Sequence, residues 1–391
     1  MGESKEKKQE FINHVETLFE VPYQNILAYD IEVFEHQSSI VFTNLDKEVV
    51  RIYTDNLNGL GEYLDKGWII QKGYDGMGEW LKDKVLLGYN NYWYDDYILY
   101  AMTMPLYSKE KEDPHFRRKL IKMWNDSIIQ NSTKVNMKKF EGCRTYDVMQ
   151  QIDVSKPGLK KIEGNLGHNI MESSVDFDID RELTSKENRE VVDYNINDVK
   201  ETVHIFKMRI EYFESKKSIV NMLPEELRNK AYRWNTTSIV AQLLRPSRPV
   251  RGGRLVSDDL LSLVPLDVQN MWKELDTTSD YKFKQKKVIV EQHGVVYEFG
   301  WGGLHAVPKG VIKRSGVKLW DGESLYPTIL ILLNGLGDKT EEYDRIRKHR
   351  FKLKHEGKKK EQAPYKLILN TMGLSIKNSL NTTSGVSIYA C

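Results

Sequence analysis

The feature that most constrains this chain is the acid-spacer-acid pattern of residues 29–32 (YDIE), which follows an apolar run. Successive side chains of a β-strand point to opposite faces of a sheet, so a strand here would present Asp30 and Glu32 on the same face. Two neighbouring carboxylates repel each other, and a hard divalent cation such as Mg²⁺ or Mn²⁺ removes that conflict. Taken alone, such a pair is more often a solvated strand end.

Two later stretches supply further groups of the same kind. The sequence GYNNYWYD follows a second apolar run and ends in Asp95. A helix is predicted over residues 187 to about 213, and in it Tyr194 and Asp198 stand four residues apart and share one face. A phenol one helical turn before a metal-binding acid could hold the water that metal ions activate.

These stretches resemble the three motifs of the 3′–5′ exonucleases of the ribonuclease-H-like DEDD class, in the form with a tyrosine in the third motif. The patterns are D-x-E, N-x(3–4)-[FY]-D and Y-x(3)-D, in this order. Val33 departs from the family, which often has Thr or Ser there, and Asp96 leaves a second choice for the ligand of the second motif. The resemblance implies a two-metal Mg²⁺ or Mn²⁺ site with the catalytic ligands Asp30, Glu32, Asp95 and Asp198, the water-orienting Tyr194 and the DNA-binding Asn90.

The segment before the third motif carries two further candidates. Pro157 breaks the chain, and a helix is predicted to follow it as far as Gly167. A similar P-G-L-K-x-I segment lines the DNA-binding side in the exonuclease family, so Lys160 could meet phosphates, although exposed lysines are more often only solvated. His168 is an alternative general base, but Tyr194 already has that place in the motif, which favours a local role for the histidine.

A second constellation lies near the C-terminal end of the sequence. Residues 319–328 (LWDGESLYPT) resemble motif A of the family B DNA polymerases, with Thr328 in place of Ser. Residues 366–373 (KLILNTMG) resemble motif B of the same family, although the family's Tyr is missing. The resemblance implies the metal ligand Asp321 and the nucleotide-binding residues Tyr326, Lys366 and Asn370.

The polymerase half is expected to be incomplete. Two-metal phosphoryl transfer needs at least two carboxylates, and the family supplies its second one downstream of motif B. No Asp or Glu follows Gly373 in this sequence. We therefore expect the N-terminal portion of a family B polymerase, without motif C or thumb, and a second polypeptide that carries the rest of the palm.

Composition sets broad limits. The formal net charge of 391 residues is only +2, so DNA binding cannot be argued from the total charge. Two cysteines, Cys143 and Cys391, argue against a disulfide framework or a cysteine zinc site. No apolar run approaches membrane-spanning length, and the charged N-terminus lacks a following apolar core, so we expect a cytoplasmic protein without a signal peptide or membrane contact.

The expected fold is α/β: a ribonuclease-H-like exonuclease domain with a mixed sheet flanked by helices, followed by an incomplete polymerase palm and fingers. The predicted division is a tail and helix at 1–22, the exonuclease at 23–215, a linker and start of the palm at 216–312, and the partial palm and fingers at 313–391. The expected function is proofreading exonuclease and DNA-directed DNA polymerase in replication, with single-stranded 3′ ends, primer–template and dNTP as ligands. The alternatives are a non-catalytic DNA-binding subunit of a split polymerase and a stand-alone 3′–5′ exonuclease.

Overall fold

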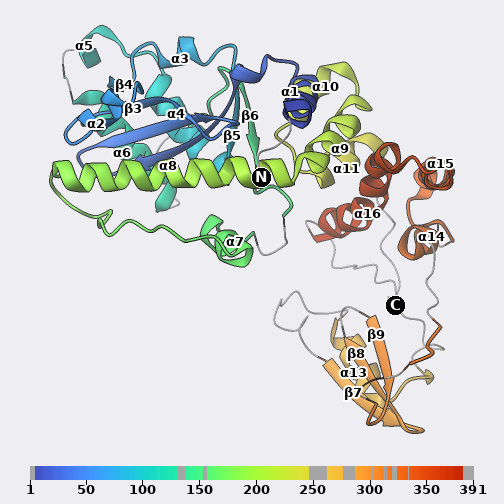
Figure 1. The fold of residues 1–391 in the computed structure, drawn as a ribbon. Coiled ribbons are helices and arrows are strands. Elements are labelled where there is room, and N and C mark those ends of the chain that lie inside the picture. The colour runs from blue at the N-terminus through green and yellow to red at the C-terminus, as the bar shows by residue number, and fades with distance from the viewer. Residues whose placement is uncertain are drawn as a thin grey trace. The chain divides into compact units, whose positions relative to one another are not determined.

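The computed structural model describes residues 5–111, 113, 115–130, 137–152, 156–245, 262–275, 287–300, 303–311, 313, 315–318, 324–332 and 334–381. Contacts divide the chain into two compact units, Met1–Lys217 and Ser218–Cys391 (Figure 1). The sequence predicted a boundary at 215, two residues before the observed division, and helix α9 (Ile210–Asn221) contains both positions. The boundaries at 22 and 312 stay predictions.

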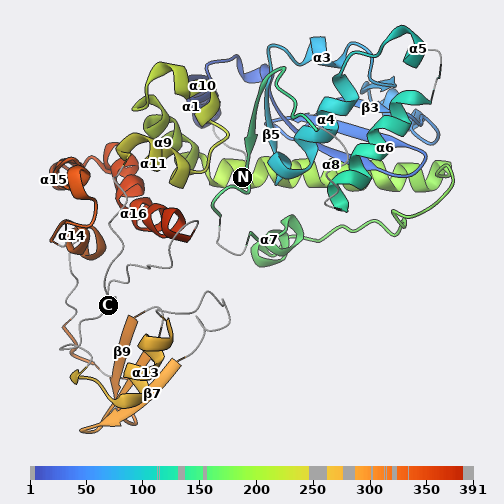
Figure 2. The same ribbon diagram turned by 180° about the vertical axis from the view of Figure 1, so that it is seen from behind.

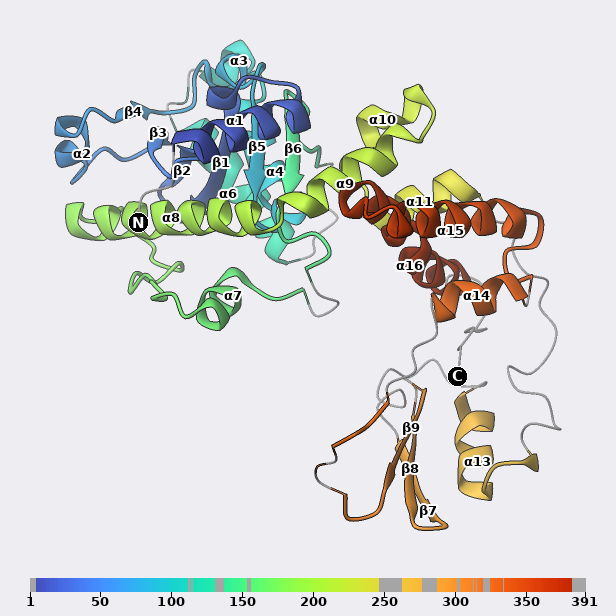
Figure 3. The ribbon, with the colours of Figure 1, turned by 45° about the vertical axis from the view of Figure 1, so that its right-hand side comes forward.

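The first unit is built around a six-stranded mixed sheet in the order β4-β3-β2-β1-β5-β6 (Figure 3). Strand β2 runs antiparallel to both of its neighbours, and the other strands all run in the direction of β1. One reversed strand in this position gives the ribonuclease-H-like arrangement, so the predicted α/β class is confirmed. The strands are β1 (Ile26–Val33), β2 (Ser38–Asn44), β3 (Val49–Thr54), β4 (Ile69–Lys72), β5 (Val85–Gly88) and β6 (Arg144–Asp147).

Helices cover both faces of this sheet. Helix α8 (Ser185–Met208) packs along β1 and β2 on one face, and α4 (Asp95–Thr103) and α6 (Phe116–Ile129) pack on the other (Figures 1 and 2). The odd-numbered residues of β1 from 27 to 33 are buried in one core with apolar residues of α4 and α6. Because side chains alternate along a strand, Asp30 and Glu32 project toward α8.

Shorter helices complete the first unit. Helix α7 follows Pro157 as predicted and is capped by Gly167, whose φ of 73° is the left-handed conformation that glycine adopts at a helix end. The segment predicted as a tail and helix contains α1, which begins at Lys5 because its first residues, Lys, Glu and Gln, all favour helix. These helices are α1 (Lys5–Phe19), α2 (Gly61–Asp65), α3 (Met77–Trp80), α5 (Ser108–Lys111) and α7 (Leu159–Leu166).

The single helix predicted over 187–213 is two helices. Helix α8 ends at Met208, and α9 begins at Ile210. Arg209 stands at the break with a φ of −109°, and its guanidinium donates hydrogen bonds to the carbonyl oxygens of Val148 and Gln150. The break is therefore anchored to the chain that leaves β6.

The second unit contains a helical group and a small sheet. Residues of α11, α14, α15 and α16 share an apolar core, and an antiparallel three-stranded sheet has the order β7-β8-β9. Pro327 lies in the first turn of α14, and Asp321 lies outside the described residues. The elements are α10 (Glu225–Ala231), α11 (Thr236–Leu244), α13 (Leu266–Leu275), β7 (Lys287–Gln292), β8 (Val295–Gly300), β9 (Gly303–Pro308), α14 (Leu325–Leu332), α15 (Thr340–His355) and α16 (Lys359–Asn381).

Candidate active site

Acidic side chains of β1 meet α8 across one face of the first unit's sheet. Asp30 and Glu32 point from the strand toward the helix, and Asp198 lies on the helix with only 8% of its surface exposed. Asn195, one turn before Asp198, donates a hydrogen bond from Nδ2 to Oδ2 of Asp30 over 3.1 Å. This bond ties α8 to β1 where the three carboxylates face one another.

A fourth carboxylate, Asp95, belongs to the same group. It is the first residue of α4 and is 6% exposed. Burial raises the pKa of Asp30 well above its usual range. The negative charges of Asp95, Glu32 and Asp198 raise the pKa of Asp30 further, which shows that the four acids lie within electrostatic reach of one another.

The pKa values of the other three carboxyl groups are also raised. Burial, followed by the charges of Asp198 and Asp95, raises the pKa of Glu32 to about 8. Burial, followed by the charge of Asp96, raises the pKa of Asp95 to about 8. Burial also raises the pKa of Asp198, against the opposing effect of Lys160. The group cannot be fully ionised at neutral pH without compensating positive charge.

The structure separates the two adjacent acids that the sequence left as alternatives. Asp96 is completely buried and accepts hydrogen bonds from the Tyr29 hydroxyl over 2.7 Å, from Asn91 Nδ2 over 3.0 Å and from the Thr145 hydroxyl over 2.9 Å. These bonds occupy its oxygens within the core. The negative charge of Asp95, in contrast, raises the pKa of Asp30, and the choice of Asp95 as the ligand of the second motif stays a prediction.

Lys160 places positive charge inside the acidic group. Its ammonium group forms an ion pair with Asp198, lies 3.5 Å from Oε1 of Glu163 and stands 4.6 Å from the centre of the Tyr194 ring. The sequence suggested phosphate contact for this lysine, whereas here it compensates a carboxylate. Burial, followed by the charge of Asp198, raises the pKa of Tyr194, so this side chain remains a neutral phenol.

The alternative base, His168, has a different environment. Its Nδ1 lies 2.7 Å from Oε2 of Glu201, and its ring lies 4.8 Å from the ring of His204. The hydrogen bond directs the imidazole to the side chain of Glu201 rather than to the carboxylates of β1. The structure thus gives His168 a local partner.

Asp147, which the sequence did not single out, holds the loop that precedes α4. Asn90 is exposed and has a left-handed backbone, with φ 61° and ψ 17°. Its N–H donates to Oδ1 of the buried Asp147 over 2.8 Å, and the N–H of Met149 donates to the same oxygen over 2.9 Å. Asp147 is the last residue of β6, and an acid directly after strand-favouring residues was the signal available in the sequence. Asp147 positions the candidate DNA contact.

The chemistry of the acidic group fits hard divalent cations. Buried carboxylates that raise one another's pKa gain most from an added positive charge, and oxygen ligands suit Mg²⁺ and Mn²⁺. Among the described residues, no three acidic, histidine or cysteine side chains converge closely enough to form a finished ligand set. Lys160 beside Asp198 supplies positive charge in this arrangement. The oxygen donors and their negative charge fit these ions, but the carboxylates are not arranged as a finished ligand set among the described residues.

The residues of the polymerase-like constellation lie in the second unit. Tyr326 on α14 is 61% exposed, and Lys366 and Asn370 are exposed one turn apart on α16. The Ser324 hydroxyl accepts a hydrogen bond from Nη1 of Arg350 over 2.7 Å, which links the start of α14 to α15. Asp321 lies outside the described residues.

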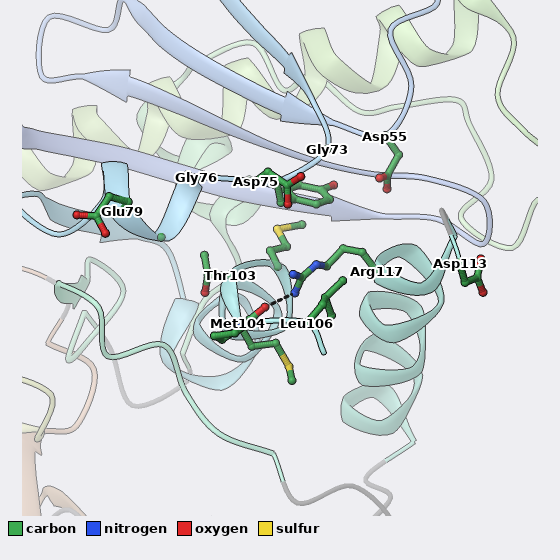
Figure 4. A pocket seen from close by; sticks show the side chains of 14 residues that line it. Asp55, Gly73, Asp75, Gly76, Glu79, Thr103, Met104, Leu106, Asp113 and Arg117 are labelled. Carbon is green, nitrogen blue, oxygen red and sulfur yellow. Dashed lines mark hydrogen bonds between the residues drawn. The ribbon is translucent and has the colours of Figure 1, made fainter. Parts of the chain in front are cut away.

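A separate cavity of about 600 Å³ lies in the first unit (Figure 4). Its lining includes Asp55, Tyr74 and Arg117, and the Arg117 guanidinium donates to the carbonyl oxygens of Ala101 and Met104 over 2.8 and 2.7 Å. None of the four carboxylates near α8 lines this cavity. It lies beside α4 and α6, which cover the other face of the sheet.

Comparisons with known proteins include a distant structural likeness. No protein-family model matches the chain, and no curated protein matches it. Among solved structures, the chain resembles the family B DNA polymerase of the hyperthermophilic archaeon Pyrobaculum calidifontis, with 13% identity and a TM-score of 0.41. The match covers 93% of this chain and 48% of that one, so the chain spans about half of the polymerase's length. Among the described residues, no helix is both long and apolar enough to cross a bilayer.

Proposed function

We propose that the first unit is a metal-dependent 3′–5′ exonuclease that shortens single-stranded DNA ends. The observation that supports it is the group of Asp30, Glu32, Asp95 and Asp198, which β1, α4 and α8 bring close enough that the last three all raise the pKa of Asp30. Groups of buried carboxylates that raise one another's pKa are typical of functional sites rather than of structural cores. A two-metal phosphodiesterase uses this donor set.

The carboxylates, Tyr194 and Lys160 would have different roles in hydrolysis of a phosphodiester. Divalent cations bound to these carboxylates would supply Lewis acidity and a water of lowered pKa for attack on a phosphodiester. Tyr194 stays protonated, so its hydroxyl can donate one hydrogen bond and accept another, and it lies one turn from Asp198 to orient the attacking water. The ammonium group of Lys160 adds positive charge to a site whose substrate is anionic.

The second unit extends the proposal to a family B DNA polymerase portion that proofreads during replication. The sequence motifs around Tyr326, Lys366 and Asn370 support it, and all three side chains are exposed as nucleotide contacts require. Synthesis would need Asp321, dNTP, primer–template and a further carboxylate from a second polypeptide. We expect the chain alone to degrade single strands and not to extend primers.

Digestion of a 5′-labelled single-stranded DNA tests the exonuclease. The purified chain should produce a ladder that shortens from the 3′ end with Mg²⁺ or Mn²⁺ and should be inactive with a chelator. Asp30→Ala combined with Glu32→Ala should abolish the ladder, whereas Asp65→Ala combined with Glu172→Ala, two exposed acids of the same unit, should not. Unchanged cleavage by the Asp30 and Glu32 variant would sink the proposal, and thermal unfolding of each variant checks the fold.

A second candidate function is a non-catalytic DNA-binding subunit of a split polymerase. The ion pair between Lys160 and Asp198, together with the open ligand geometry, favours it, because the internal lysine already compensates part of the negative charge. This alternative predicts strand binding without cleavage in Mg²⁺ or Mn²⁺. It would be abandoned if the metal-dependent ladder appears and disappears with the Asp30 and Glu32 substitutions.

A further inference from the structure

An exposed tryptophan stands beside the candidate active site. Trp93 has 62% of its surface exposed, although burial of so large an aromatic side chain normally stabilises a fold. It lies in the short helical turn Asn91–Trp93, two residues before Asp95. The turn that orients the second-motif acid thus also presents an indole ring to solvent.

Two lysines from later segments of the chain converge on this ring. The ammonium nitrogen of Lys139 lies 5.2 Å from the centre of the Trp93 ring, and that of Lys156 lies 5.8 Å from it. Lys139 also lies within 5.9 Å of the Tyr92 ring centre and 5.0 Å of the Tyr97 ring centre. The chain therefore gathers aromatic surface and positive charge at one place, from segments 46 and 63 residues apart in sequence from Trp93.

A short segment connects this place to the carboxylates. Lys156 is followed by Pro157, whose carbonyl oxygen accepts a hydrogen bond from the Tyr89 hydroxyl over 2.6 Å, and then by Lys160, which pairs with Asp198. Four residues of fully extended chain span at most about 14 Å. The backbones of Lys156 and Lys160 are therefore no farther apart than the length of a few nucleotides.

We infer that Trp93, Lys139 and Lys156 form a subsite for a single nucleic-acid strand, upstream of the bond that is cut. A base stacks on the indole, and the two ammonium groups neutralise neighbouring phosphates, a combination that binds single strands without reading their sequence. Charge complementarity selects a polyanion over an apolar partner for a surface that carries two lysines. The inference rests on the proposed function for the position of the cleaved bond, but the binding surface can be tested by itself.

Binding is measured first, without metal, so that no hydrolysis is required. The probe is a fluorescent 12-nucleotide oligo-dT in EDTA, followed by anisotropy with the full chain. Trp93→Ala should weaken binding at least about fivefold, and Trp93→Phe should retain most of the affinity because stacking needs only an aromatic face. Tyr107→Ala, at an aromatic residue 78% exposed elsewhere in the same unit, serves as the control and should bind normally.

The lysines are tested by the salt dependence of the same binding. Lys139→Gln with Lys156→Gln should lower the slope of log affinity against log salt by roughly 1.4, because each phosphate contact on a single strand contributes about 0.7. Lys66→Gln is the matched control, since that lysine lies 5.4 Å from the ring centre of Trp68, a tryptophan that stacks on Tyr63 instead. Binding and a salt slope that stay unchanged in the Trp93 and lysine variants overturn the inference and leave this surface to a protein partner.

Kinetics in Mg²⁺ then separate the subsite from the chemistry. On long single strands Trp93→Ala should raise KM at least about fivefold with kcat unchanged, and on a dinucleotide, which is too short to reach the subsite, it should behave like wild type. Weakened binding in EDTA together with no cleavage by any form would overturn the proposed exonuclease and support the strand-binding subsite. Cleavage of long strands with an unaltered KM in Trp93→Ala would overturn the subsite and leave the exonuclease standing.

Discussion

Replacing Glu32 with Gln should stabilise the metal-free protein at high pH, although the side chain is buried and polar. Burial, followed by the charges of Asp198 and Asp95, raises the pKa of this carboxyl from 4.5 to about 8 in the folded protein. A carboxyl with a raised folded pKa gives its full stability below pH 4.5 and loses it as the pH rises through 8. The gap between the two values corresponds to an upper limit of about 5 kcal/mol at about 1.4 kcal/mol per pH unit.

The carboxylates share protons, so the measured gain should be smaller than that limit. We expect Glu32→Gln to be about 2–4 kcal/mol more stable than wild type at pH 9 in EDTA, a rise in Tm of roughly 4–16 °C for a unit of this size, and nearly equal to wild type at pH 5. Thermal unfolding at both pH values is the assay, with Glu172→Gln as a control at an exposed acid. A stability difference between Glu32→Gln and wild type that is the same at both pH values would refute the reasoning.

Three further predictions follow from local geometry. Tyr194→Phe should lower kcat for strand cleavage at least about tenfold in single-turnover kinetics and leave KM unchanged, because only the hydroxyl that orients water is lost. Asp147→Ala should cost about 2–4 kcal/mol in urea unfolding, since the N–H groups of Asn90 and Met149 lose their buried acceptor, while Asp147→Asn keeps an acceptor oxygen and should cost less. Thr184→Ala, which breaks the capping box at the start of α8, should cost about 1 kcal/mol in the same assay, and an unchanged midpoint would contradict the assigned cap.

The strand and helix periods explain why part of the site could be predicted from sequence. Asp30 and Glu32 share a face because a strand repeats every two residues, and Tyr194 and Asp198 share a face because a helix repeats every 3.6. Each pair depends only on its own element, so no knowledge of the rest of the chain was needed. The observed sheet order then brought the strand pair opposite the helix pair.

Contacts between distant segments could not be predicted in this way. The sequence left Asp96 as a second choice beside Asp95, and hydrogen bonds from Tyr29, 67 residues earlier, and Thr145, 49 residues later, hold Asp96 in the core. The ion pair between Lys160 and Asp198 joins residues 38 apart in sequence. Arg209 donates a hydrogen bond to Val148, 61 residues earlier, at the point where α8 ends before the predicted end of the helix. The period of apolar residues predicts which face of a helix or strand is buried, but it does not predict which other segment packs against that face.

The cost of burying four carboxyl groups close together supports the proposal that this group binds cations. A fold gains nothing from burying several carboxyl groups whose charged forms burial disfavours, and replacing one of them with a neutral side chain is expected to stabilise the metal-free protein. The bond from Asn195 to Asp30 and the ion pair between Lys160 and Asp198 do not remove this cost, because the pKa values of all four carboxyl groups stay raised. Added cations are the species that would turn this destabilising repulsion into binding energy. If Mg²⁺ stabilises the wild-type protein against unfolding but does not stabilise Glu32→Gln, the carboxyl group that destabilises the metal-free fold is one that binds the metal.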